Sequence, residues 1–106
     1  MKKVTVLRRD LYYEAIIQLR PATEELLNFV ERQVAKRKDV WISKIVEHKT
    51  GIDLYISSRK FARALGMKLK RSFKGELKIT KSLYGVDRQT SKRIWRVTVL
   101  FRLRKD

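Results

Sequence analysis

The stretch GIDLYISSRKFARAL (residues 51–65) contains two kinds of periodicity side by side. In its first half every second residue from Ile52 to Ile56 is apolar, as in a strand with one buried face. After the two serines the apolar residues recur every three or four positions, as on one side of a helix. A serine at such a junction can accept hydrogen bonds from the first helical turn. The stretch therefore predicts a strand over residues 52–57 and an amphipathic helix that continues to about Phe73.

Similar patterns predict the remaining elements on both sides of this stretch. Alternating or apolar runs predict strands over residues 12–20, 40–47, 75–83 and 93–103. A second helical stripe follows Thr23, which is a candidate N-cap. The order β-α-β-β-α-β-β is typical of an α+β fold. We predict a two-layer sandwich with both helices on one face of a mainly antiparallel sheet. Residues 12–103 would form this single domain, after a leading strand or arm (residues 1–11) and before a basic tail (residues 104–106).

The two faces of the predicted sheet differ in character. In the first strand the alternation assigns Tyr13 and Ala15 to the face that meets the helices. The opposite face is expected to be open. It would carry Tyr12, Tyr55, Lys78, Thr80, Arg96 and Arg102.

The strongest compositional feature is an excess of positive charge. The chain has 27 Lys and Arg residues against 11 Asp and Glu residues, which gives a formal net charge of +16. The excess is uneven, because residues 1–58 carry 11 basic and 8 acidic side chains whereas residues 59–106 carry 16 and 3. This concentration predicts a polyanionic partner: RNA, DNA or an anionic membrane surface. No apolar run approaches the roughly 20 residues of a membrane-spanning helix, so we expect no membrane insertion.

Residues 51–65 also combine a glycine, an aspartate, an aromatic residue, two serines and an alanine-bearing basic helix in a fixed order. These are Gly51, Asp53, Tyr55, Ser57, Ser58, Arg59, Lys60 and Ala62. The order resembles the middle of the nonsense-mediated-decay-three family, the export adaptors of the large ribosomal subunit in eukaryotes and their archaeal counterparts. YYEAIIQLR (residues 12–20) resembles the first strand of that module, and residues 79–103 resemble its closing hairpin in the archaeal version.

The resemblance covers residues 12–103 and implies a role in maturation or export of the large ribosomal subunit. The family's N-terminal CxxC pairs for zinc have no counterpart, because the chain has no cysteine. Its C-terminal β-rich domains have no room in 106 residues. Zinc binding and export activity are therefore not carried over. We expect a cytoplasmic, non-enzymatic module that docks on large-subunit ribosomal RNA and needs no cofactor. Neighbouring domains of a longer protein are further candidate partners.

Three basic surfaces are candidates for RNA contact. The second helix carries Arg59, Lys60, Arg63, Lys70, Arg71 and Lys74, with no acid between Asp53 and Glu76. The hairpin link YGVDRQTSKRIW (residues 84–95) is longer than a tight turn of two to five residues, and it carries Arg88, Lys92 and Arg93. On the open face Arg96 lies near aromatic residues that can stack on unpaired bases. The alternatives are a solvated helix side, a loop without a partner, and tyrosines that pair across strands.

Two other functions remain open. The open face or a sheet edge could dock another protein domain, with the charge serving only to steer encounter. More remotely, Asp53, Glu76 and Lys78 loosely resemble the acid, acid and lysine set of metal-dependent nucleases. His48, the single histidine, falls in a predicted turn, and we expect it to be exposed to solvent.

Overall fold

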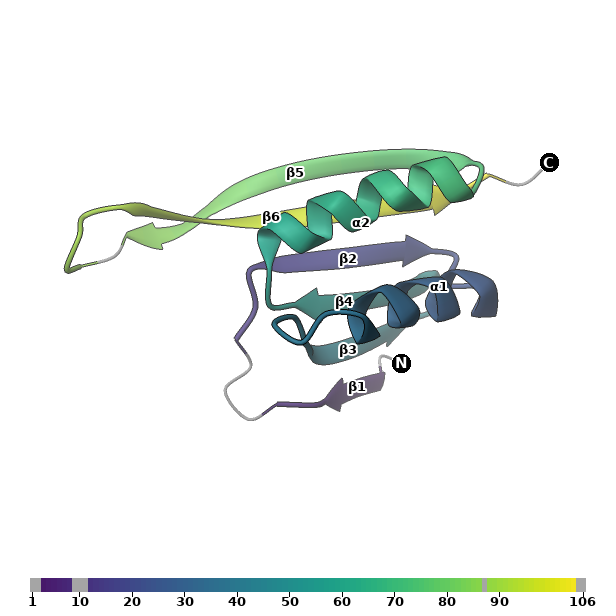
Figure 1. The fold of residues 1–106 in the computed structure, drawn as a ribbon, viewed down its shortest axis with the longest axis horizontal. Coiled ribbons are helices and arrows are strands. Elements are labelled where there is room, and N and C mark those ends of the chain that lie inside the picture. Colours follow the sequence, from purple (N-terminus) through teal and green to yellow (C-terminus); the bar gives the residue numbers. More distant parts are fainter. Residues whose placement is uncertain (1–2, 9–11, 87, 105–106) are drawn as a thin grey trace.

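The computed structural model describes residues 3–8, 12–86 and 88–104. The described residues form a six-stranded sheet and two helices (Figure 1). In chain order the elements are β1 (Lys3–Val6), β2 (Ala15–Arg20), α1 (Glu24–Ala35), β3 (Ile42–His48), β4 (Gly51–Ile56), α2 (Arg59–Ser72), β5 (Gly75–Val86) and β6 (Arg93–Leu103). The α+β class and the two helices agree with the prediction. The predicted order β-α-β-β-α-β-β has one strand too few, because β1, within the segment expected as a leading strand or arm (residues 1–11), precedes it and joins the sheet.

The strand order across the sheet is β1-β3-β4-β2-β6-β5. Four of the neighbouring pairs are antiparallel, and only β2 and β6 are parallel. The sheet is thus mainly antiparallel, as predicted. β1 joins the edge by pairing Lys3 with Glu47 and Val6 with Lys44. Four residues are too short to show a periodic pattern, and this pairing with a distant segment is a tertiary contact.

Both helices lie on one face of the sheet and close a single hydrophobic core (Figure 1). α1 contributes Leu26 and Val30, and the ring of Phe29 meets that of Phe73 edge to face at 5.4 Å. The enclosed sheet residues are Ala15, Ile17, Leu19, Leu54, Ile56, Val97, Val99 and Phe101. Burial of each large side chain among them contributes roughly 1.5–3 kcal/mol.

Each helix begins at the predicted cap. The hydroxyl of Thr23 accepts a hydrogen bond from the backbone N–H of Leu26 at 3.2 Å. At α2 the cap is Ser58, whose hydroxyl accepts from the N–H of Phe61 at 3.1 Å. The neighbouring Ser57 has another role, because its hydroxyl accepts from the N–H of Trp41 at 3.0 Å. The structure thus selects between the two serines that the sequence left as alternatives.

The residues just before β2 depart from the predicted alternation. The ring of Tyr13 meets Tyr55 on the open face, with centroids 4.8 Å apart, so its assignment to the core face was wrong. Glu14 instead directs its carboxylate to the helix side, where it accepts from the backbone N–H of Arg59 at 3.0 Å. Tyr12, predicted for the open face, donates its hydroxyl to Glu14. Strict alternation applies only within a paired strand, and β2 begins two residues after Tyr13.

β5 and β6 continue past the rest of the sheet as a two-stranded arm (Figure 1). β5 runs to Val86, further than predicted, and its pairing with β6 reaches Val86↔Arg93 with a shift between Leu83 and Gly85. The link outside the strands is therefore residues 87–92, shorter than the sequence suggested, and Asp87 lies outside the described residues. The arm accounts for the elongated shape, whose principal extents are 50, 29 and 26 Å.

Candidate nucleic-acid interface

Helix α2 turns one apolar side to the core and one cationic side to solvent. The side chains of Phe61, Leu65 and Leu69 are buried, because their spacing of three or four residues keeps them on one side. Within α2, four of the predicted cations are exposed on the outward side: Lys60, Arg63, Lys70 and Arg71. This division of the helix agrees with the prediction. We call these four residues the cationic side of α2.

The cationic side of α2 has no carboxylate partner among the described residues. The carboxylates in ion pairs have partners outside α2: Glu47 pairs with Lys3, Asp39 with Arg37, and Asp53 with both Arg20 and His48. The exposed side of α1, by contrast, carries both signs, because Glu24, Glu31 and Arg32 are all exposed. Mixed signs are usual on a solvated helix because they allow pairing along it. The unpaired charge on α2 is therefore available to an external anion.

Two residues that the sequence analysis did not single out also belong to this side of α2. The ammonium group of Lys68 donates to the side-chain oxygen of Gln33 at 3.3 Å and so connects α2 to α1. Met67 is 52% exposed and lies among the cations. The same helical spacing that located Arg63 places both residues outward.

Arg59 is held at the beginning of α2. Its guanidinium donates to the carbonyl of Trp95 at 2.8 Å. The first turn of α2 contains no acid. Glu14 supplies the carboxylate that the positive end of the helix dipole favours, by accepting from the N–H of Arg59. Arg59 therefore anchors α2 to β6, and the exposed cations begin at Lys60.

A basic hollow lies at the C-terminal end of α2. It has a volume of about 480 Å³ and is lined by Lys70, Arg71, Ser72, Phe73, Lys74, Gly75 and Arg104. The backbone N–H of Arg104 donates to the carbonyl of Lys74 at 2.9 Å, which brings the end of β6 beside the end of α2. The sequence assigned Arg104 to a separate tail, because this proximity arises only from the pairing of β5 with β6. The negative end of the helix dipole favours cations at this place.

Arg88, Lys92 and Arg93 lie at the far end of the β5–β6 arm, and all three are exposed. This end of the arm projects past the N-terminal end of α2 (Figure 1). The basic hollow lies at the opposite end of the helix. Two of the predicted surfaces, the second helix and the hairpin link, thus follow one another along the long axis of the molecule.

Arg96 is separated from these residues because it lies on the open face of the sheet. Its guanidinium covers the ring of Tyr13 at 3.8 Å and donates to the hydroxyl of Tyr13 at 3.0 Å. On the neighbouring ring, the ammonium of Lys44 lies 4.4 Å from the centroid of Tyr55. Stacking of an RNA base on these ring faces would have to displace the cations that cover them.

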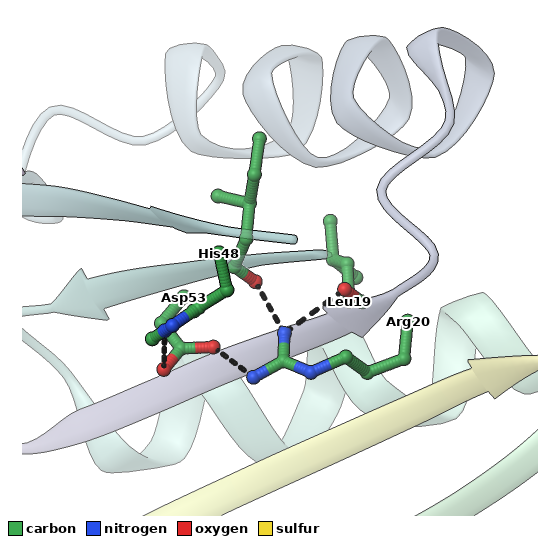
Figure 2. A network of polar contacts seen from close by, with 5 residues as sticks. Leu19, Arg20, His48 and Asp53 are labelled. Atoms are coloured by element: carbon green, nitrogen blue, oxygen red, sulfur yellow. Dashed lines mark hydrogen bonds and ion pairs between the residues drawn. The ribbon is translucent and has the colours of Figure 1, made fainter. Parts of the chain in front are cut away.

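At the other end of the open face, Asp53 is the centre of a polar network (Figure 2). Its carboxylate accepts from the guanidinium of Arg20 at 2.5 Å and lies 3.0 Å from Nε2 of His48. Arg20 also donates to the carbonyls of Leu19 and Ile52, at 3.0 and 3.2 Å. The side chain of His48 is only 20% exposed, so the expectation of a solvent-exposed histidine was wrong. His48 is the last residue of β3 and pairs with Gly51 of β4, so it lies in the sheet and not in the predicted turn.

The residues of the nuclease hypothesis do not meet. Asp53 lies on β4, whereas Glu76 and Lys78 lie on β5, and β2 and β6 separate these strands. At about 4.8 Å per strand the separation is roughly 14 Å. Within residues 3–8, 12–86 and 88–104, no three His, Asp or Glu side chains are placed to hold a metal ion. Neither α1 nor α2 has the length and apolar character required to cross a membrane.

These features define a small basic α+β domain with a cationic helix on one side and a partly aromatic sheet face on the other. Residues 12–103 match the family model described as NMD3, second domain. The match covers most of the chain, and the chain belongs to the NMD3 family. This confirms the resemblance found in the sequence. A comparison with curated proteins gave no match. The NMD3 family is associated with the large ribosomal subunit, so the function of the chain is ribosome-related.

Proposed function

We propose that the protein binds large-subunit ribosomal RNA through the cationic side of α2 during maturation or export of the subunit. The observation that carries this proposal is the row formed by Lys60, Arg63, Lys70 and Arg71, which are exposed and have no carboxylate partner among the described residues. Each cation that contacts a phosphate releases a counterion, and this release supplies affinity without reading sequence. Specificity would then come from the shape of the RNA and from neighbouring domains.

The dependence of affinity on salt tests this proposal. Binding of the full chain to labelled large-subunit ribosomal RNA would be measured by fluorescence anisotropy at several salt concentrations. About four to seven phosphate contacts predict that the logarithm of affinity falls with the logarithm of salt concentration at a slope of about −3 to −6. Affinity that stays constant from low to moderate salt would contradict the proposal.

Charge reversal locates the surface. The triple substitution Arg63→Glu, Lys70→Glu and Arg71→Glu should weaken binding at least about tenfold, because it replaces three phosphate contacts by repulsion. The matched control reverses three exposed cations at the end of α1: Arg32→Glu, Lys36→Glu and Lys38→Glu. Both variants change the net charge equally, and circular dichroism would establish that both are folded. Equal losses in the two variants would show that α2 is not the RNA-binding surface.

A second candidate function is protein docking on the open face. Val4 and Val6 of β1 are 53% and 56% exposed, and Val4 pairs with Val46 in the sheet. If this face docks a protein, binding to intact large subunits should be insensitive to salt and to the α2 charge reversal. It should weaken in the double variant Val4→Thr, Val6→Thr, which keeps the shape and strand preference of the side chains.

A further inference from the structure

We propose that α2 and the β5–β6 arm together recognise double-stranded RNA, with α2 in the minor groove and the tip of the arm on the backbone further along the same duplex. This inference rests on the proposed function and specifies the form of RNA that its surface takes. Three features of the structure support it: the arrangement of side chains on α2, the covered tyrosines of the open face, and the direction of the arm.

The outward ridge of α2 has charged ends and an uncharged middle. Residues at spacings of four, three and four form this ridge, which runs from Lys60 through Ala64 and Met67 to Arg71. Ala64 and Met67 are exposed. Arg63 and its neighbour two turns on, Lys70, lie along one flank. A helix placed in a groove needs this arrangement, with short or flexible side chains over the groove floor and cations that reach the phosphates at its walls.

The minor groove of A-form RNA is wide and shallow and displays ribose hydroxyls, whereas the deep major groove is too narrow for side chains to read. With side chains, a helix is about 10–12 Å across, and the 14 residues of α2 span roughly 21 Å. Ala64 and Met67 carry no group that reads base edges. They suit recognition by shape, which is the way proteins recognise double-stranded RNA.

Recognition of single strands would require aromatic rings that are free to stack on bases. The outward side of α2 has none, since its single aromatic residue, Phe61, is buried. On the open face, Tyr13 and Tyr55 are covered by Arg96 and Lys44. Phe61, Tyr13 and Tyr55 are thus engaged in intramolecular contacts, which favours a duplex over a single strand.

The arm supplies a second contact at a distance. Its tip carries exposed Arg88, Lys92 and Arg93 and projects past the N-terminal end of α2, in a molecule whose longest extent is 50 Å (Figure 1). A duplex aligned with this axis can contact both elements at once. Known double-stranded RNA-binding domains read shape in this way over about 16 base pairs, in successive grooves.

The first test compares the form of the nucleic acid. The full chain would be titrated with a 20-base-pair RNA duplex, with one strand of that duplex, and with a DNA duplex of the same sequence. The expected result is affinity for the RNA duplex at least about tenfold above the other two at equal salt. Equal or tighter binding of the single strand or the DNA duplex would overturn the inference while leaving the proposed function standing. If neither the RNA duplex, the single strand nor large-subunit ribosomal RNA binds, the inference and the proposed function are both refuted.

The second test examines the middle of the ridge and the arm. Met67→Glu places a carboxylate over the groove floor and should weaken duplex binding at least about tenfold, whereas Asn28→Glu, at an exposed position on α1, should leave it nearly unchanged. Replacement of residues 88–92 by Asn-Gly should abolish the gain in affinity that wild type shows when the duplex is lengthened from about 8 to about 20 base pairs. Equal effects of the two Glu variants, or an undiminished gain in the trimmed variant, would overturn the inference.

Discussion

The guanidinium of Arg20 lies 2.5 Å from the carboxylate of Asp53, although these residues belong to different strands and are 33 positions apart in the chain. Both side chains are largely buried, at 18% and 10% exposure. Asp53 also meets His48, so that one carboxylate serves two basic groups. The aspartate that the sequence suggested as a nuclease acid is therefore part of the scaffold that joins β2, β3 and β4.

Asp53→Asn should destabilise the fold by about 3 kcal/mol, the lower end of the range for breaking a buried ion pair, because Arg20 would remain buried without a countercharge. The free energy of unfolding in urea would measure this. Asp39→Asn is the matched control, since Asp39 pairs with Arg37 at the surface, and it should change stability little. Similar losses for both variants would contradict the structural role of Asp53.

Gly51→Ala should lower the free energy of unfolding at least as much as Asp53→Asn. A Cβ at residue 51 would lie 1.9 Å from the carbonyl oxygen of Leu19. That oxygen belongs to the backbone of β2 and cannot move without disturbing the sheet, so we expect a loss of more than about 3 kcal/mol. Gly85→Ala is the control, since a Cβ there has no heavy atom within 4 Å. Thermal unfolding of both variants compares them directly, and a stable Gly51→Ala protein would refute the close contact.

Arg63→Ala should affect RNA binding and not stability, whereas Arg96→Ala should affect stability and not RNA binding. Arg63 is exposed on α2, so its loss should leave stability nearly unchanged and make the salt slope of RNA binding shallower by about one unit. Arg96 covers Tyr13, so its loss should cost about 1 kcal/mol of stability and leave RNA affinity close to wild type. Urea unfolding and anisotropy titrations on the same samples would measure both quantities. A large affinity loss in Arg96→Ala would place the open face in the RNA contact.

Tyr55 makes stability depend on alkaline pH. Burial raises the pKa of its phenol, and the neighbouring Tyr13 and Asp53 raise it further. Because the pKa is higher in the folded state, the contribution to stability is complete below the unfolded value near pH 10 and is lost as the pH rises through the folded value. The free energy of unfolding should therefore fall less steeply above about pH 10 in Tyr55→Phe than in wild type. Identical pH dependence in the two proteins would show that Tyr55 does not contribute.

Much of the fold followed from local patterns. Alternation along β6 and the apolar stripe of α2 place Val97, Val99, Leu65 and Leu69 correctly in the core, because periodicity records which side of an element is buried. The capping serine and threonine also lie where the sequence put them. Tyr13 and the end of β5 are among the errors. There the direction of a side chain or the length of a strand depends on pairing with distant residues, which a local pattern does not contain.

The candidate site likewise has some features that a local pattern predicts and others that depend on distant contacts. Helical spacing was sufficient to place Lys60, Arg63, Lys70 and Arg71 outward, since a helix sets these directions within its own turns. It was not sufficient to show that Arg59 is tied to Trp95 or that Arg104 reaches the basic hollow. Those contacts require β5 and β6 to pair and α2 to lie on them.

The sequence by itself determined the class of fold, the amphipathic side of α2, the uneven charge and the resemblance to the NMD3 family, because each is a local or compositional property. Only the tertiary structure decided which cations of α2 have no carboxylate partner within residues 3–8, 12–86 and 88–104, which tyrosine faces are covered and how far the arm extends. Partners such as Arg20 and Asp53, or Arg96 and Tyr13, are distant in the chain and meet only when the strands are in register. Register is a property of the whole sheet, and for that reason no single segment predicts it.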